Sequence, residues 1–153
     1  MIYSELVRTA MIIACKAHEG EVDKGGYPYI HHVMHVAEYM PDEKTVCAAL
    51  LHDVVENTPI TCEILRGAGI PQEVLHALSL LTHDPDTPYL DYISQLMGDP
   101  IARAVKLADL RHNSDPSRLP CADAQAQERL QKYQQALRLL ESNGGNGEDP
   151  SHI

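Results

Sequence analysis

Apolar residues recur at spacings of three and four along most of the chain, and the period-2 alternation of strands is nearly missing. This pattern is typical of amphipathic helices, so the sequence predicts an all-α fold. The chain has 153 residues, a length that suits one domain with its own core. Because Phe and Trp are both absent, we expect Leu, Ile, Val, Ala and Met to fill that core.

Capping residues, prolines and glycines divide the chain into a bundle of seven or eight short helices. The expected helices cover about residues 4–17, 30–39, 43–57, 61–67, 71–81, 89–97, 99–113 and 123–141. We expect residues 1–142 to form a single domain. The glycine-rich tail 143–153 cannot bury enough apolar surface to order itself, so we expect it to be disordered.

The charge and the cysteine content indicate which partners and which cellular compartment to expect. Twelve Lys and Arg against 22 Asp and Glu give a net charge of −10, which argues against a nucleic-acid or anionic-membrane surface. No apolar run is long enough to span a bilayer, and no signal-peptide pattern follows Met1. The four cysteines are scattered without a C-x-x-C pair, as expected for reduced thiols in a cytoplasmic protein.

The apolar stretch from Ala48 to Thr58 is interrupted by His52, Asp53 and Glu56. On a continuous helix His52 and Glu56 lie one turn apart, with Asp53 beside them. Buried carboxylates are unfavourable unless they are paired or bound to a metal, and imidazole and carboxylate ligands both suit Mn, Fe or Zn. A divalent cation site is one interpretation. A helix end whose acids face water is the other.

Similar polar interruptions occur in two other predicted helices. His32 follows Tyr29 at the start of one helix, and Asp109 lies in an otherwise well-patterned helix, with Asn113 one turn later. Each of these residues alone could be a satisfied core group or a surface group. Together with His52 and Asp53 they offer two imidazoles and two carboxylates from three helices, which is how metal sites in helical bundles are built.

Three ordered motifs carry a resemblance to a known family: Gly26-x-Pro28-Tyr29-Ile30-x-His32, then Ala49-Leu50-Leu51-His52-Asp53-x-Val55-Glu56, then Lys106-Leu107-Ala108-Asp109-x-x-x-Asn113. The chain resembles the HD metal-dependent phosphohydrolases. More narrowly, it resembles the small alarmone hydrolases and the hydrolase domain of the bifunctional alarmone synthetase/hydrolases. The Ala17-His18-x-Gly20 element also fits, and the likeness covers roughly residues 10–137.

The resemblance implies an HD-type bundle in which His32, His52, Asp53 and Asp109 hold one divalent metal, manganese in the alarmone branch. It assigns catalysis to Glu56 and the neighbouring Asn57, with Glu56 orienting or deprotonating a metal-activated water.

The resemblance also implies a set of substrate-binding residues. Lys24 would meet a phosphate, and Asn113 would hydrogen-bond sugar or phosphate. Arg129 and Tyr133, one turn apart on the last helix, match an Arg-x-x-x-Tyr pair that grips and stacks against the substrate. Each of these residues could equally be an ordinary surface or helix residue.

Several positions depart from the family pattern. Asn57 stands where the family has an acid, Asp23 replaces an Arg placed against the guanine base, and Val33 replaces a Pro. Arg111 and His112 stand where a Leu-His pair is common. These changes leave the metal ligands intact and put the guanine specificity in question.

The expected function is metal-dependent hydrolysis of a small phosphorylated nucleotide, best matched by removal of the 3′-pyrophosphate from guanosine 3′,5′-bis(diphosphate). The alternatives are a nucleotidase or phosphomonoesterase acting on another nucleotide, and a metal-bearing alarmone-binding protein without turnover. Neither a nucleic-acid polymer nor a membrane is expected as a partner.

Overall fold

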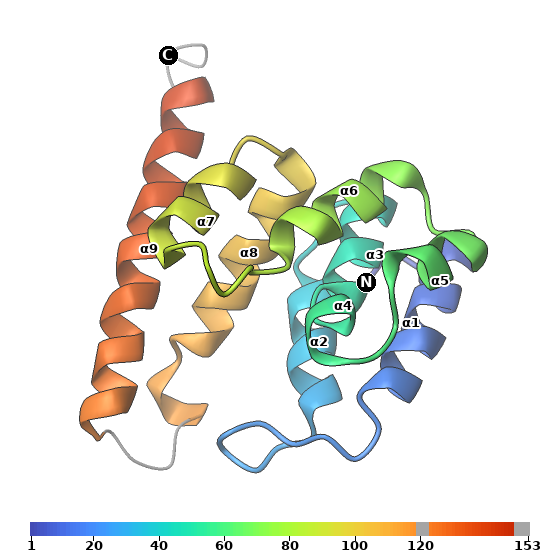
Figure 1. The fold of residues 1–153 in the computed structure, drawn as a ribbon, viewed down its shortest axis with the longest axis horizontal. Helices are drawn as coiled ribbons and strands as arrows, with labels where there is room; N and C mark the ends of the chain where they lie inside the picture. The colour runs from blue at the N-terminus through green and yellow to red at the C-terminus, as the bar shows by residue number, and fades with distance from the viewer. Residues whose placement is uncertain (119–122, 149–153) are drawn as a thin grey trace.

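The computed structural model of the chain describes residues 1–118 and 123–148, with side chains as far as residue 142. Within these residues every regular element is helical, apart from an isolated bridge between Val22 and Pro28 (Figure 1). This confirms the all-α prediction. Eight α-helices exceed one turn: α1 (Glu5–Ala17), α2 (Tyr29–Glu38), α3 (Glu43–Leu51), α5 (Cys62–Gly67), α6 (Gln72–Leu81), α7 (Tyr89–Leu96), α8 (Pro100–Asn113) and α9 (Ala124–Glu148).

The predicted N-cap residues form capping hydrogen bonds at the expected helix starts. The side chains of Ser4, Thr61 and Asp99 accept hydrogen bonds from backbone N–H groups in the first turns of α1, α5 and α8. Asp42 and Thr45 form a reciprocal capping box at the start of α3. These local interactions explain why the helix starts could be read from the sequence.

Helix α3 is the centre of the core. Every residue from Thr45 to Leu51 is buried, and the helix packs against α1, α2, α6 and α8. A helix that is apolar on all sides must be covered on all sides, which is what this arrangement achieves. The polar side chains that follow Leu51 are therefore carried into the interior of the bundle.

The helix predicted over residues 43–57 is wrong as a single element. It ends at Leu51, and the one-turn helix α4 (Val54–Asn57) follows after a break at His52 and Asp53. Asp53 has φ −106° and ψ −1°, away from ideal helical values. The sequence hides this break, because the apolar pattern continues through Val54 and Val55.

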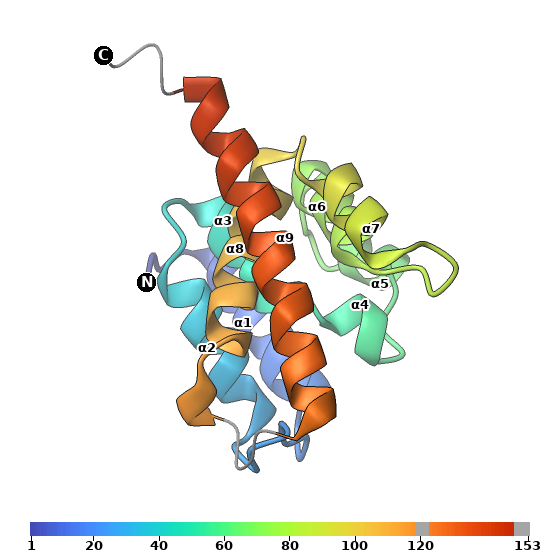
Figure 2. The same cartoon turned by 90° about the vertical axis from the view of Figure 1, so that its left-hand side faces the viewer.

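Helices α7, α8 and α9 form one side of the molecule, with α9 packed along both α7 and α8 (Figures 1 and 2). Helix α9 continues to Glu148, so it includes residues 143–148 of the predicted tail, and the domain boundary at residue 142 stays a prediction. Residues 149–153 of the predicted tail, and Cys121, lie outside the described residues.

The segment between α1 and α2 is a tight loop. The backbone N–H of Asp23 donates to the carbonyl oxygen of Tyr27, and that of Tyr29 donates to Glu21. Gly26 has a φ of 85°, a conformation that a residue with a Cβ rarely adopts, so the turn depends on this glycine. Across the described part of the chain, none of the helices has the length and apolar character needed to cross a membrane.

Candidate metal centre and adjoining cavity

Three of the four predicted metal ligands meet in the interior, although they come from distant parts of the sequence. His32 from α2, His52 from the α3–α4 break and Asp109 from α8 place ligand atoms within 4.8 Å of one another. His32 Nε2 lies 2.9 Å from Asp109 Oδ1, and His52 Nε2 lies 3.4 Å from the same oxygen. All three side chains are buried.

Asp53, the fourth predicted ligand, borders this cluster. Its Oδ2 lies 3.0 Å from His52 Nε2 and also accepts a hydrogen bond from the hydroxyl of Tyr29. Adjacent residues of a regular helix point about 100° apart, so the break after Leu51 allows these two neighbouring side chains to converge.

Each histidine is oriented by its second ring nitrogen. His52 Nδ1 lies 2.6 Å from the carbonyl oxygen of Ala49. A carbonyl only accepts, so Nδ1 carries the proton and Nε2 faces the carboxylates. His32 Nδ1 lies 2.7 Å from His112 Nδ1, and the two ring planes are nearly parallel with centroids 4.9 Å apart. Burial, and next the Arg118 cation, lower the pKa of His112 to about 3, so its ring is neutral and can accept a hydrogen bond from His32 Nδ1.

The charges in the cluster stabilise one another. Burial would raise the pKa of Asp109, but Lys106, whose Nζ lies 3.1 Å from Oδ2, and the two imidazoles hold that pKa well below its usual value. Burial would lower the pKa of His52, yet Asp53 and Asp109 raise it well above its usual value. The metal-free site therefore holds a proton on His52 Nε2 in place of a cation.

The residues present fit a divalent metal. His52 Nε2 is fully buried and has no well-aligned hydrogen-bond partner, while the nitrogen and oxygen donors around it are the types that Mn, Fe and Zn accept. His32, His52 and Asp109 would hold the ion, and the convergent Asp53 would complete the set. Both imidazoles also have the hydrogen-bonded second nitrogen that is usual in metal-ligating histidines.

A cavity of about 200 Å³ opens beside this cluster and is lined by His52, Asp53, Glu56, Lys106 and Asp109, among others. Glu56 Oε1 accepts a hydrogen bond of 2.6 Å from the backbone N–H of His83, which fixes the carboxylate at the cavity wall. Asn57, the second predicted catalytic residue, is exposed and lines neither this cavity nor the larger one beside it.

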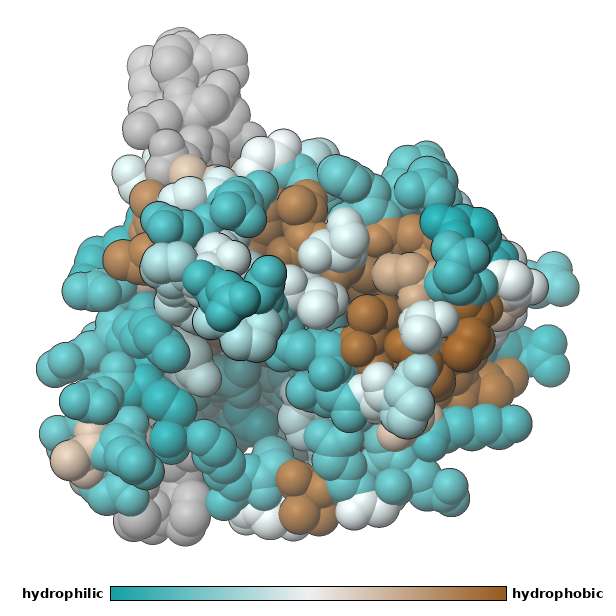
Figure 3. Space-filling view, in the orientation of Figure 1, coloured by the Kyte–Doolittle hydropathy of each residue, from teal (hydrophilic) through white to brown (hydrophobic). Residues whose placement is uncertain are grey.

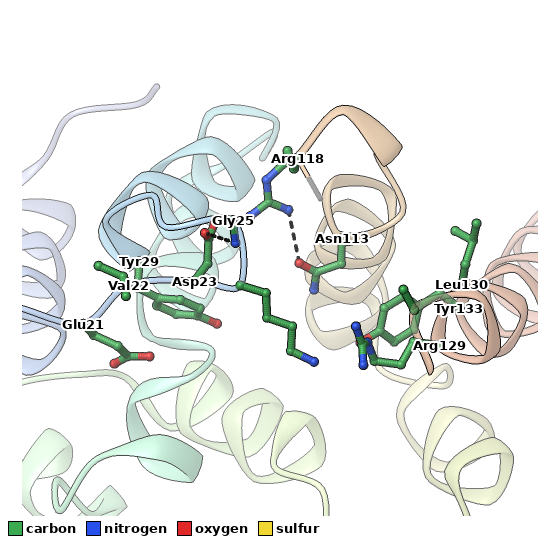
Figure 4. Close-up of a pocket in the computed structure, with 12 residues that line it drawn as sticks. Glu21, Val22, Asp23, Gly25, Tyr29, Asn113, Arg118, Arg129, Leu130 and Tyr133 are labelled. Atoms are coloured by element: carbon green, nitrogen blue, oxygen red, sulfur yellow. Dashed lines mark hydrogen bonds and ion pairs between the residues drawn. The ribbon is translucent and has the colours of Figure 1, made fainter. Parts of the chain in front are cut away.

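The larger cavity, of about 400 Å³, gathers all four predicted substrate-binding residues: Lys24, Asn113, Arg129 and Tyr133. Figure 4 shows Arg129 and Tyr133 of α9 facing Tyr29 and the loop after α1 across the opening. Asn113 and Tyr133 line both cavities, so the two spaces adjoin. This face of the molecule is hollowed, with hydrophilic side chains around the hollow (Figure 3).

Cations collect around the joined cavities of an otherwise acidic chain. Lys24 and Arg129 line the larger cavity, Lys132 and Lys106 the smaller one. Burial, and next the Arg129 cation, lower the pKa of Lys24. Apart from Lys106, none of these cations has an ion-pair partner among residues 1–118 and 123–142. Lys24, Arg129 and Lys132 can therefore meet negative charges of a ligand. Carboxylates line the same two cavities: Glu21, Asp23, Asp53, Glu56 and Asp109.

Sequence reasoning missed three residues that support the metal cluster. Tyr29 donates to Asp53, Lys106 pairs with Asp109, and His112 contacts His32. All three lie inside the quoted motifs, but a motif does not reveal which neighbours of a ligand turn inward. Of the departures, Val33 is simply a buried core residue.

Comparison with known proteins agrees with the geometry. Residues 10–75 match the family model of the HD domain, and this segment belongs to the HD domain family. The match contains His32, His52 and Asp53 and ends before Asp109.

Two sequence relatives are similar to this chain over most of its length. The chain is 48% identical to the bifunctional (p)ppGpp synthase/hydrolase SpoT of Escherichia coli K12, over 70% of this chain and 17% of that protein. It is 36% identical to the guanosine-3′,5′-bis(diphosphate) 3′-pyrophosphohydrolase of Haemophilus influenzae, over 67% of this chain and 17% of that protein. The chain thus spans about a sixth of the length of these relatives.

A solved structure described as a metazoan ortholog of SpoT that hydrolyses ppGpp superposes with a TM-score of 0.72. The match covers 90% of this chain and 88% of that one at 23% identity, which establishes the shared fold.

Proposed function

We propose that the chain is a metal-dependent phosphohydrolase that removes the 3′-pyrophosphate from guanosine 3′,5′-bis(diphosphate). The observation that carries this proposal is the junction of two cavities, one beside a buried metal-ligand cluster and one lined by Lys24 and Arg129. A nucleotide with two diphosphate groups needs such a site, with a place for reaction and cations for the remaining charge. The names of the relatives support the same substrate.

We further propose Mn²⁺ as the metal, because the resemblance to the alarmone hydrolases implies manganese and the mixed imidazole and carboxylate donors suit it. When bound, such an ion polarises a phosphoryl oxygen and lowers the pKa of a coordinated water. The free thiols of Cys15, Cys47 and Cys62 support a cytoplasmic location for the enzyme.

Residues of the chain would activate the water, bind the substrate and keep the metal ligand ionised. Glu56, with Oε1 held by the His83 N–H, would accept a proton from the attacking water through Oε2. Lys24 and Arg129 would bind phosphate oxygens, and Tyr133 would stack on the base or hydrogen-bond the ligand. Lys106 would keep Asp109 ionised, because an ammonium 3.1 Å away favours the carboxylate.

The test is a hydrolysis assay of the manganese-loaded chain. The panel should contain guanosine tetraphosphate and pentaphosphate, nucleoside mono- and triphosphates and NADPH, with phosphate and pyrophosphate measured separately. We expect pyrophosphate from the guanosine polyphosphates. Release of phosphate from monoesters alone would point to a nucleotidase, and binding without release to a non-catalytic alarmone-binding protein.

A further inference from the structure

Both oxygens of the Asp23 carboxylate are bonded to other groups of the protein. Its Oδ1 accepts hydrogen bonds from the backbone N–H groups of Gly25 (2.9 Å) and Tyr27 (3.0 Å). Its Oδ2 forms an ion pair of 2.8 Å with Nη2 of Arg118, a residue 95 positions later in the chain. The two side chains are only 10% and 15% exposed, so water screens this pair poorly.

Arg118 in turn is fixed at the end of α8. Its Nη1 donates to the carbonyl oxygen of His112 at 2.8 Å and to Oδ1 of Asn113 at 3.3 Å (Figure 4). Nδ2 of Asn113 then donates to Oδ1 of Asp109 at 3.1 Å. Because a guanidinium only donates and a carboxylate only accepts, the Asn113 amide has one consistent orientation.

Glycine at position 25 allows the loop to approach this arginine. A Cβ on Gly25 would overlap the backbone oxygen of Arg118. Lys24 lines the larger cavity and lies between Asp23 and Gly25 in the chain. Arg118 pairs with the Asp23 side chain, and its backbone lies against Gly25. The position of the Lys24 backbone is thus set from both sides by Arg118.

We propose that Asp23 and Arg118 form a latch that positions Lys24 for the substrate's phosphate, so that the latch decides how tightly the nucleotide polyphosphate binds. This inference rests on the proposed function only for the identity of the ligand. Asp23 and Arg118 border the larger cavity, but the carboxylate of Asp23 and both Nη atoms of Arg118 are bonded within the protein, which makes them positioning residues. Arg118 also links the loop to the metal ligand Asp109 through Asn113.

Calorimetric titration of the metal-free full chain with guanosine tetraphosphate tests the latch without turnover. Asp23→Asn keeps an oxygen for Gly25 and Tyr27 but can turn an amide N–H toward Arg118. We expect this variant and Arg118→Gln to weaken binding about tenfold or more, since small misplacements of a binding group are costly. Gly25→Ala should weaken binding in the same direction with no change of charge.

A double-mutant cycle separates positioning from a general loss of structure. If Asp23 acts through Lys24, then Lys24→Met should have much less effect in the Asp23→Asn background than in the wild type. Arg111→Gln is the matched control, because Arg111 lies on α8 in an exposed ion pair with Glu141. It removes the same charge and should bind like the wild type.

Three results would overturn the latch. The first is unchanged affinity in Asp23→Asn, and the second is additive effects of Asp23→Asn and Lys24→Met. The third is a wild-type chain that binds neither guanosine tetraphosphate nor inorganic pyrophosphate. A lower melting temperature in Asp23→Asn with unchanged affinity would show a purely structural pair. Failure of the proposed function would look different, because the tetraphosphate would bind but release no pyrophosphate when manganese is added.

Discussion

At the scale of single residues, the site depends on hydrogen bonds that fix the direction of each polar group. The second nitrogen of each histidine is occupied, by the Ala49 carbonyl in His52 and by His112 in His32. Glu56 has one oxygen on the His83 N–H. Groups held in this way need little reorganisation when ligand binds, which favours both binding and reaction.

Glu56 and Asn57 are neighbours on α4 with different surroundings, so a substitution at one position serves as the control for a substitution at the other. Glu56→Gln should retain metal but lower kcat by about 100-fold or more, the usual contribution of a positioned general base. Asn57→Asp, at an exposed position that lines neither cavity, should leave kcat within about twofold, the scale of small surface changes. Initial rates with guanosine tetraphosphate and elemental analysis of bound manganese check both. Comparable rates in Glu56→Gln and wild type would exclude the carboxylate as the base.

Metal binding should depend on pH through His52. Asp53 and Asp109 raise the pKa of His52 in the metal-free fold, against the opposing effect of burial, so a proton and the cation compete for Nε2. Below that pKa, each unit of decreasing pH should weaken manganese affinity about tenfold, because one proton must leave. Titrations at several pH values measure this slope. A pH-independent affinity over the range from 5 to 7 would contradict a protonated His52.

At the scale of elements, the sequence predicted helices well and their interruptions poorly. Caps such as Ser4 and Asp42 act within one turn, so their signals are local and readable. At the break, Asp53 contacts Tyr29 and His52 contacts Asp109, and both partners lie at least 24 positions away in the sequence. The grouping of His32, His52 and Asp109 could be predicted from residue type and motif order, and their role as metal ligands stays a prediction. The Arg118 pairing could not be predicted, since nothing local distinguishes it.

Helix α3 should dominate the stability of the bundle. Leu50 is fully buried within it, so Leu50→Ala should lower the free energy of unfolding by about 2–5 kcal/mol. Leu90→Ala on α7 is the control, since Leu90 is 42% exposed and its loss should change stability by about 0.5 kcal/mol or less. Urea denaturation followed by circular dichroism measures both variants. Equal effects would show that α3 is not the centre of the core.

At the scale of the whole molecule, the candidate metal site brings together side chains from segments that lie far apart in the sequence. His32 comes from α2, His52 and Asp53 from the α3–α4 break, and Asp109 from α8. The larger cavity adds the loop before α2 and the helix α9 (Figure 1). A ligand held by these groups therefore binds the folded chain only.

Manganese should raise the melting temperature, because a cation that binds only the folded state stabilises it by mass action. At 100 times its Kd the gain is about 2.7 kcal/mol, or roughly 5–10 °C for a chain of this size. Thermal scans with manganese and with a chelator measure the shift, and His52→Ala should abolish it. A shift that persists in His52→Ala would place the ion elsewhere.

The two imidazoles of the cluster differ in how they tolerate sequence change. The ring of His52 is held by a main-chain carbonyl, which any residue that fits at position 49 would still supply. The ring of His32 is held by the side chain of His112, which a single codon change can remove. Evolutionary drift would therefore loosen this centre first on its α2 side, while the side after α3 stays anchored by the polypeptide itself.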